Sequence, residues 1–422
     1  MEQNMTAPQI PDLQEAERAY EAWVQKKVVL DMSRGKPGKE QLDMVSDILT
    51  VLRDPDQCLD GGVDVRNYGT LKGIPSARAL FADILGCRAD QIFVGGSASL
   101  QLMYDAISKA MTHGMKNSSS PWAKSDRKLK WLCPAPGYDR HFKITESFGF
   151  EMITIAMTPE GPDMEQVLEY IRDPDVKGIW LVPKYSNPTG IVFSDETIRS
   201  LAAMKPAAPD FMMMWDNAYC VHEIDGVFEP FEDILSLCGE AGNADMVYEF
   251  ASTSKITLPG AGISCMASSA ANIDYIANLA NVQLISYDKV NQMRHVLYLK
   301  DRAHTLELMK KHAAILKPKF DMVCRILEEE IAPLHLAQWN SPKGGYFIAV
   351  RTLPHLASET LRLCKEAGVT MTSAGAVFPY GKDPDDAWVR IAPSLPSPQE
   401  LETAMHIFAA SLKLAAARMA KA

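Results

Sequence analysis

Four continuous apolar runs along the middle of the chain constrain its fold more than any other feature of the sequence. The runs end at Cys133, Val182, Trp215 and Phe250, and amphipathic helical stretches separate them. A strand that is apolar on both faces is buried on both, which is typical of a parallel sheet covered by helices. Ser194 is placed to cap one of the intervening helices. The pattern therefore predicts an α/β architecture.

The order of elements changes near residue 300, and we place a domain boundary there. The sequence beyond it predicts one or two helices over 301–330, a strand around 346–350, a helix near 359–366, a strand at 388–391 and a final helix from Pro398. We expect the N-terminal residues to pack on this C-terminal lobe. The predicted organisation is an N-terminal segment over 1–45, a large domain over 46–300 and a small domain over 301–422.

Charge and the lengths of the apolar runs exclude several classes of function. The chain has 43 basic and 53 acidic residues and no block of lysines and arginines, so it lacks the electrostatic footprint of a nucleic-acid or membrane-surface binder. Its apolar runs are far shorter than the ~20 residues of a membrane span, and its N-terminus does not resemble a secretory signal. The eight cysteines are scattered without a CxxC pair, which favours reduced thiols, a cytoplasmic location and no metal site. We expect small-molecule partners.

Ligands of open α/β sheets bind beyond the carboxyl ends of the strands, so the residues that follow each predicted strand are the candidates for a site. A turn containing Ser97, Ala98 and Ser99 follows the strand at 92–94 and precedes a helix. Small side chains and the free N–H groups of a helix N-terminus suit a phosphate, although such turns are far more often plain caps. Asn187 follows the strand at 180–182, where its amide either donates to a ligand or only completes a turn.

Two further strands end near ionisable side chains. Asp216 ends a very apolar run, so it either needs a cationic or hydrogen-bonding partner or acts as a helix cap. Lys255 follows the strand at 247–250 among small hydroxyl residues. Most lysines are solvated surface charges, but a lysine in a desolvated site has a lowered pKa and can form a Schiff base. Pyridoxal phosphate requires a phosphate cradle, an amine, a carboxylate and donors to its phenolic oxygen, and these strand ends supply all four.

Several stretches of sequence resemble one known family. Residues 186–190 (SNPTG), 216–219 (DNAY) and 252–255 (STSK) are similar to motifs of the fold type I, class I aminotransferases, and 33–37, 136–141 and 287–291 further resemble a bacterial aspartate aminotransferase subgroup. The resemblance covers most of the chain. It implies a pyridoxal-phosphate-dependent transferase with a large domain on a mixed, mostly parallel sheet and a smaller α+β domain.

The resemblance also implies roles for individual residues. Lys255 would hold the cofactor as a Schiff base and then move the proton of the substrate, while Asp216 would keep the pyridine nitrogen protonated. Asn187 and Tyr219 would hydrogen-bond the phenolic oxygen, and Tyr138 would stack on the ring. The phosphate would be contacted by Ser97, Ala98, Ser99 and Ser252, and by Tyr68 of the neighbouring subunit, which implies a homodimer with shared sites.

One position departs from the family pattern. Many relatives have a phosphate-binding arginine eight residues after the Schiff-base lysine, but this chain has Ile263 there. Another residue, the helix dipole, or the hydroxyls of Ser97, Ser99 and Ser252 must then balance more of the phosphate charge.

The substrate contacts follow from the same resemblance. Arg390 matches the arginine for the substrate α-carboxylate, with Gly35 and Asn187 beside it, although a surface or interface salt bridge is the alternative from the sequence alone. Arg34 is our candidate for a second carboxylate, and its alternative is a solvated charge. We therefore expect transamination between aspartate or glutamate and 2-oxoglutarate or oxaloacetate.

Two rival functions use the same residues or the same fold. A β-lyase or decarboxylase could use Lys255 and Asp216, because pyridoxal phosphate supports several bond cleavages. An effector-binding regulator could use the fold without catalysis, but the sequence has no appended basic helix-turn-helix segment. A nicotinamide-dependent dehydrogenase is disfavoured, because residues 95–97 do not form a G-x-G-x-x-G turn.

Overall fold

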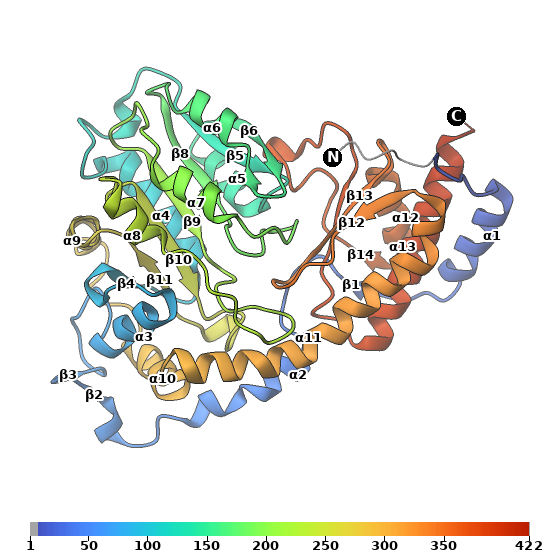
Figure 1. Ribbon diagram of the computed structural model, residues 1–422. Coiled ribbons are helices and arrows are strands. Elements are labelled where there is room, and N and C mark those ends of the chain that lie inside the picture. The colour runs from blue at the N-terminus through green and yellow to red at the C-terminus, as the bar shows by residue number, and fades with distance from the viewer. Residues whose placement is uncertain (1–6, 422) are drawn as a thin grey trace.

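The four apolar runs form adjacent parallel strands of one sheet, as predicted (Figure 1). They are β5 (Lys130–Ala135), β8 (Val176–Leu181), β9 (Met212–Asp216) and β10 (Val247–Ser252). The other strands of the sheet are β4 (Ile92–Val94), β6 (Glu151–Thr158), β7 (Gly161–Pro162) and β11 (Ser264–Ala267). The order across the sheet is β4-β11-β10-β9-β8-β5-β6-β7, and only β7 and β11 run antiparallel to their neighbours. The large sheet is therefore mixed and mostly parallel.

Helices cover both faces of this sheet because its strands are apolar on both sides. All five residues of β9 are buried, and burial of one large apolar side chain stabilises the fold by about 1.5–3 kcal/mol. One face packs against α4 (Ser99–His113), α5 (Asp139–Ser147) and α9 (Ala270–Ala280). The other packs against α3 (Pro75–Leu85), α6 (Met164–Tyr170), α7 (Asp195–Ala202), α8 (Ile234–Glu240) and α10 (Lys289–Leu299). Ser194 caps α7 by accepting from the Thr197 N–H, as predicted.

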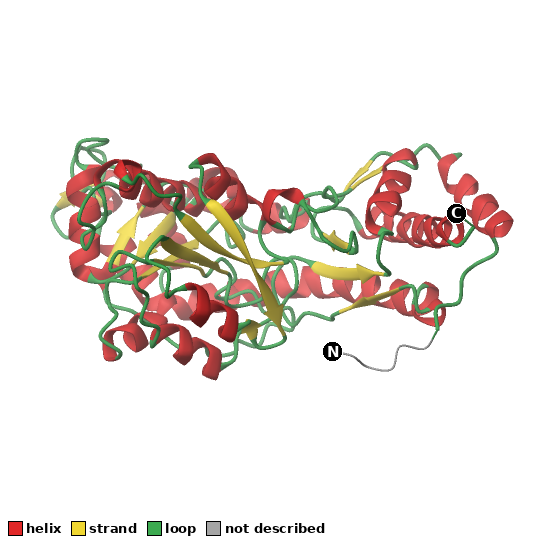
Figure 2. Ribbon diagram, turned by 90° about the horizontal axis from the view of Figure 1, so that it is seen from above, coloured by secondary structure: helices red, strands yellow, loops and turns green. Residues whose placement is uncertain are grey.

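A second lobe follows the sheet, and Figure 2 shows the two lobes side by side. Residues 301–330 form one helix, α11 (Arg302–Glu330), which is capped by Asp301 and runs along both lobes in Figure 1. A three-stranded antiparallel sheet contains β12 (Ala337–Trp339), β13 (Ile348–Thr352) and β15 (Trp388–Ile391). Helices α12 (Ala357–Glu366) and α13 (Pro398–Met419) complete this lobe. The strand expected around 346–350 thus begins two residues later than predicted.

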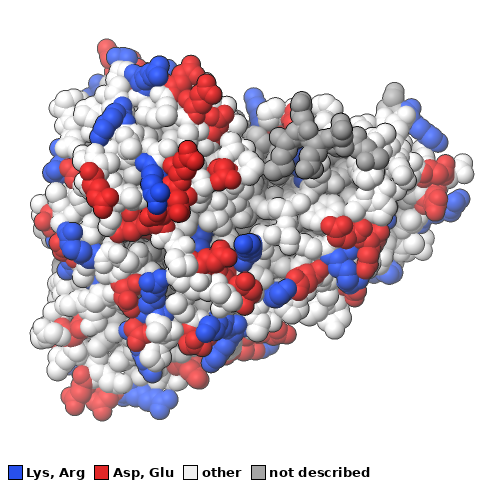
Figure 3. All heavy atoms as spheres, in the orientation of Figure 1, with Lys and Arg blue, Asp and Glu red and all other residues white. Residues whose placement is uncertain are grey.

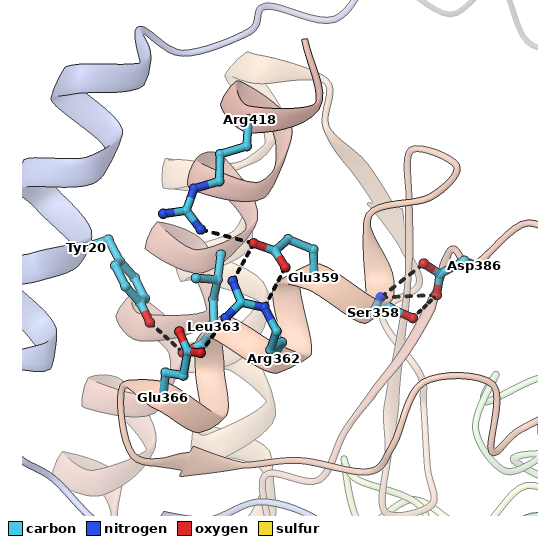
Figure 4. Close-up of polar contacts among 8 residues, drawn as sticks. All are labelled: Tyr20, Ser358, Glu359, Arg362, Leu363, Glu366, Asp386 and Arg418. Carbon is cyan, nitrogen blue, oxygen red and sulfur yellow. Dashed lines mark hydrogen bonds and ion pairs between the residues drawn. The ribbon is translucent and has the colours of Figure 1, made fainter. Parts of the chain in front are cut away.

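The N-terminal residues attach to the C-terminal lobe. The computed structural model describes residues 7–421, so residues 1–6 of the predicted N-terminal segment lie outside the described residues. Helix α1 (Leu13–Val24) packs against α13, and β1 (Leu30–Asp31) pairs with β14 (Val369–Thr370). The Tyr20 hydroxyl donates to the Leu363 carbonyl at 2.9 Å, beside the ion pairs that Glu359 makes with Arg362 and Arg418 (Figure 4). The Tyr20 hydrogen bond therefore joins α1 to α12.

Short elements connect these parts. Helix α2 (Lys39–Met44) follows the N-terminal segment, and β2 (Leu59–Asp60) pairs with β3 (Val63–Asp64). Single turns of 3₁₀ helix cover Ser46–Thr50, Pro55–Cys58, Ala89–Gln91, Trp122–Lys124, Pro259–Ala261, Ala332–Leu334 and Pro379–Gly381. No helix within residues 7–421 is both long and apolar enough to cross a membrane. Basic and acidic side chains are interspersed over the face seen in Figure 3.

The topology brings the carboxyl ends of six strands to one edge of the large sheet. Strand β4 runs parallel to β10 because both are antiparallel to β11, so the carboxyl ends of β4, β5, β6, β8, β9 and β10 meet there. From β5 the chain continues to β6 on one side and then to β8 on the other. Such a reversal opens a crevice between the two diverging connections, where ligands of α/β sheets bind.

Candidate active site

A cavity of about 620 Å³ lies at this edge, and both lobes line it. Among the site residues predicted from the sequence, only Ser97 and Tyr68 are absent from its lining. The predicted residues that do line it are Arg34, Gly35, Ala98, Ser99, Tyr138, Asn187, Asp216, Tyr219, Ser252, Lys255 and Arg390. The topology thus gathers residues that lie more than 350 positions apart in the sequence.

Lys255 follows β10 and carries the amine of the cavity. Its Nζ lies 5.0 Å from the ring centroid of Tyr219 and 5.7 Å from that of Tyr346. Burial lowers the pKa of Lys255, and the negative charge of Asp216 acts in the opposite direction. A lowered pKa leaves a larger fraction of the amine neutral near pH 7, which is the state that attacks a carbonyl or accepts a proton.

Asp216 ends β9 and has one oxygen available to the cavity. Its Oδ2 lies 3.0 Å from Nε2 of His141, while its buried Oδ1 has no partner among the described residues. The His141 ring stacks on Trp180 with a centroid distance of 4.3 Å and an interplanar angle of 9°, so its orientation is fixed. His141 belongs to the 136–141 motif, but the resemblance assigns it no role. Its position three residues after Tyr138, in the segment that follows a predicted strand, is the feature of the sequence that indicates a place near the site.

The N-terminus of α4 forms the predicted anion cradle. Ala98 occupies the cap position and makes no side-chain cap hydrogen bond, so the first N–H groups of the helix are available to a ligand. Ser252 and Ser254 approach from the end of β10 and also line the cavity. The Ser254 hydroxyl donates to the Ser97 carbonyl at 3.1 Å. Ser97 therefore shapes the turn through its backbone, and Ser254 is a hydroxyl of the cradle to which the sequence analysis gave no role.

Arg390 comes from β15 and is only 3% exposed. Its Nη1 donates to Asp139 Oδ1 at 3.1 Å and to Asn187 Oδ1 at 3.2 Å, and its Nη2 donates to Thr372 Oγ1 at 3.0 Å. Its guanidinium carbon lies 4.7 Å from the ring centroid of Phe347. Because a guanidinium has five N–H groups, these three bonds leave two for a carboxylate. Its burial excludes a surface salt bridge, whereas its contact with Asp139 is an ion pair between the two lobes.

Arg34 and Tyr68 are the exposed members of the predicted set. The Arg34 side chain is 45% exposed, and its Nη1 lies 3.6 Å from Asp139 Oδ2. Tyr68 is 80% exposed and lies outside the cavity lining, so its predicted contact with a neighbouring subunit stays a prediction. Asp139, Thr372 and Phe347 were missed by the sequence analysis. Asp139 directly follows Tyr138 in the 136–141 motif, whereas no periodicity or strand end marks Thr372 or Phe347; only the packing of the two lobes brings all three to Arg390.

The residues present fit pyridoxal phosphate. The unpartnered Asp216 Oδ1 suits a pyridine N–H, Lys255 supplies an amine, and the α4 N-terminus supplies N–H donors. Burial raises the pKa of Tyr138 to about 12 and that of Tyr219 well above its ordinary value. Both hydroxyls therefore remain protonated donors at neutral pH. Within residues 7–421, no cluster of three or more His, Cys, Asp or Glu side chains could hold a metal ion.

The strand order, the second lobe and this set of groups define a fold type I aminotransferase. An α-aminoadipate aminotransferase from Thermus thermophilus, solved with N-(5′-phosphopyridoxyl)-L-leucine, has a TM-score of 0.75 to this chain at 18% identity, with 97% of this chain and 98% of that chain covered. At this identity the likeness concerns the fold alone.

The chain belongs to the aspartate amino-transferase family, whose profile matches residues 5–422. An aspartate aminotransferase of Corynebacterium glutamicum is 44% identical over 404 residues, which cover 96% of this chain and 93% of that protein. A crystal structure of an aspartate transaminase from the same species has a TM-score of 0.94 at 44% identity and covers 96% of both chains. The chain is therefore an aminotransferase.

Proposed function

We propose that this aminotransferase exchanges the amino group between aspartate or glutamate and 2-oxoglutarate or oxaloacetate, with pyridoxal 5′-phosphate bound at Lys255. One observation carries the proposal: the half-buried Lys255, the unpartnered Asp216 oxygen and the buried Arg390 guanidinium belong to one cavity. The relatives named aspartate aminotransferase and aspartate transaminase support the choice of substrates. A β-lyase or decarboxylase would use the same amine and carboxylate, but no feature of the cavity favours either over transamination.

Lys255 and Asp216 have the central roles in this proposal. When bound, the cofactor supplies an electron sink that lowers the barrier to breaking the Cα–H bond of the amino acid. Lys255 would hold the cofactor through its amine, and its amine would also move the Cα proton of the amino acid. Asp216, held by His141, accepts a hydrogen bond from the pyridine nitrogen through its free oxygen. The lowered pKa of Lys255 suits both of its tasks.

The surrounding residues hold the cofactor in place. Tyr138 stacks on its ring, and the Tyr219 hydroxyl and the Asn187 amide donate to its phenolic oxygen. Asn187 retains its NH₂ group for this purpose, because its Oδ1 accepts from Arg390. The phosphate would bind to the α4 N-terminus at Ala98 and Ser99 and to the Ser252 hydroxyl, whereas Ser97, predicted as a further contact, lies outside the lining and supports the turn through its carbonyl. Ser254 joins this group.

Two arginines bind the substrate in this proposal. Arg390 takes the α-carboxylate as a bidentate pair, which a lysine could not copy. Arg34 takes the second carboxylate of aspartate or glutamate. Gly35 also lines the cavity, and a side chain there would collide with Phe347, since a Cβ would lie 2.6 Å from its Cζ. Asp139 contacts both arginines from one side.

The proposal extends to assembly, domains and location. Tyr68 is strongly exposed, which suits a contact with the phosphate of a second copy in a homodimer with shared sites. The packing of α1 on α13 supports a division into a segment over 1–45, a large domain over 46–300 and a small domain over 301–422. All eight cysteines, each within the described residues, are free, which supports a cytoplasmic location.

Borohydride trapping tests the attachment of the cofactor. Reduction of the protein loaded with pyridoxal phosphate should fix the cofactor on one peptide, the one that contains Lys255, and leave Lys36, the other lysine of the lining, unmodified. Lys255→Ala should remain folded and lose transamination. A modified peptide elsewhere, or wild-type turnover by Lys255→Ala, would refute the assignment.

An amino-acid panel tests the substrate and the reaction. Aspartate and glutamate should change the visible absorption of the loaded enzyme and yield the matching oxo acids. Preference for an apolar amino acid would contradict the substrate class. Release of ammonia with pyruvate, or of carbon dioxide, would contradict the reaction.

A further inference from the structure

The carboxylate of Asp139 bridges the two arginines of the cavity. Its Oδ1 lies 3.1 Å from Arg390 Nη1, and its Oδ2 lies 3.6 Å from Arg34 Nη1. Both arginines line the cavity, whereas Asp139 does not belong to its lining and is 17% exposed. Asp139 is the first residue of α5, where the helix dipole favours a negative charge. The carboxylate therefore stands behind both guanidiniums and holds them from one side.

The two arginines depend on Asp139 to different degrees. Arg390 is also held by Asn187 and Thr372. Arg34 has no other ion-pair partner among residues 7–421, and it lies on the loop between β1 and α2. Two guanidiniums this close repel each other in a partly buried site. The shared carboxylate offsets that repulsion, and its loss would release Arg34 while leaving Arg390 in place.

We propose that Asp139 is a positioning residue that holds Arg34 at a fixed spacing from Arg390 and thereby gives the enzyme its preference for substrates with two carboxylates. The inference rests on the proposed function and deepens it. Arg390 alone binds the carboxylate that every amino acid has. The Arg34–Asp139 contact serves only substrates with a second carboxylate. Asp139 contacts no substrate atom and acts through the two arginines.

Asp139→Asn tests the contact with Arg34 apart from the contact with Arg390, because asparagine has nearly the same shape as aspartate. The amide oxygen of asparagine can still accept from the better-held Arg390, but its NH₂ group then faces Arg34 and cannot accept from it. We expect the KM for aspartate to rise by about tenfold, as for the loss of one partly exposed charged contact. The KM for alanine should change by less than about twofold, and kcat for aspartate should be retained within about threefold, since no reacting group is touched.

Three comparisons make the experiment decisive. Glu146→Gln, on the same helix but paired only with the exposed Lys143, should leave both KM values unchanged. Arg34→Gln should reproduce the selective effect on aspartate, and the double variant should be no worse than Arg34→Gln alone, because Asp139 acts on the second carboxylate only through Arg34. Succinate, titrated by calorimetry, should bind about tenfold more weakly to Asp139→Asn without any need for turnover.

Several results would overturn the inference. Tighter succinate binding by Asp139→Asn would mean that the Asp139 carboxylate weakens the positive potential of the two arginines and does not position Arg34. An equal loss for aspartate and alanine, or additive effects with Arg34→Gln, would mean a general structural role. If Asp139→Asn fails to fold, a normal aspartate KM for Arg34→Gln would refute the inference by itself. A wild-type enzyme inactive toward aspartate would instead refute the proposed function, which the succinate titration does not assume.

Discussion

Replacement of Glu249 by glutamine should stabilise the protein by an amount that grows with pH. Glu249 lies on β10, is 4% exposed and accepts a hydrogen bond from Asn217 Nδ2 at 2.8 Å. Burial raises the pKa of its carboxyl from 4.5 to about 8; the Asn217 hydrogen bond opposes this shift and the charge of Asp233 adds to it. The structure thus keeps Glu249 protonated at a pH where an exposed glutamate is ionised.

The magnitude follows from the two pKa values. Between pH 4.5 and about 8 the folded protein binds a proton at Glu249 that the unfolded chain has released, so the free energy of unfolding falls as the pH rises through this window. At about 1.4 kcal/mol per pKa unit, the loss is below about 1 kcal/mol at pH 5, about 4 kcal/mol at pH 7.5 and roughly 5 kcal/mol above pH 8. Glutamine has a similar shape, can still accept from Asn217 and does not titrate, so it avoids this loss.

The assay is urea unfolding of the wild type and Glu249→Gln at pH 5, 6.5, 8 and 9. The stability difference between them should be small at pH 5, widen up to pH 8 and then become constant. Glu240→Gln, at the exposed end of α8, is the matched control and should follow the wild type. Parallel stability curves for the wild type and Glu249→Gln would refute the argument, because they would mean that Glu249 titrates alike in the folded and unfolded chains.

Two further variants test the geometry of the active site. Gly35→Ala would place a Cβ 2.6 Å from the Cζ of Phe347, whose ring lies against Arg390. Thermal melting should show that the free energy of unfolding falls by about 1–3 kcal/mol, and steady-state kinetics should show a higher KM for the amino acid. An unchanged KM would contradict the packing. His141→Phe removes the hydrogen-bond donor to the buried Asp216 carboxylate. The free energy of unfolding should fall by about 1–3 kcal/mol, and kcat should fall by a larger factor than KM rises. An unchanged kcat would show that Asp216 needs no such partner.

Control variants separate these effects from general disruption. Gly239→Ala, where a Cβ would meet nothing within 4 Å, should be neutral or stabilising, since alanine favours the α8 helix. His141→Asn keeps an N–H donor and should recover part of the kcat lost in His141→Phe.

The parts of the site that could be predicted from the sequence are those set by local pattern. Continuous apolar runs predict the strands. The residues that follow each run are then expected at the ligand-binding edge, and Asp216 and Lys255 are among them. Asp139 and Thr372 could not be found this way, because their role arises only when the C-terminal lobe brings Arg390 to them. The start of β13 was displaced by two residues because the strand boundary depends on pairing with β12 and β15 rather than on the sequence of 346–350 alone.

The departure at Ile263 has a physical basis in the fold. Ile263 is 1% exposed and packs in the core on the side of the large sheet covered by α3 and α10. Its backbone pairs with Thr253, two residues before Lys255. An arginine in this core would lose its hydration and be stable only while an anion neutralised it. Isoleucine makes the packing beside Lys255 independent of any anion, so the positive potential for a phosphate must come from other parts of the cavity, which include the uncapped N-terminus of α4, Lys36 and Arg140.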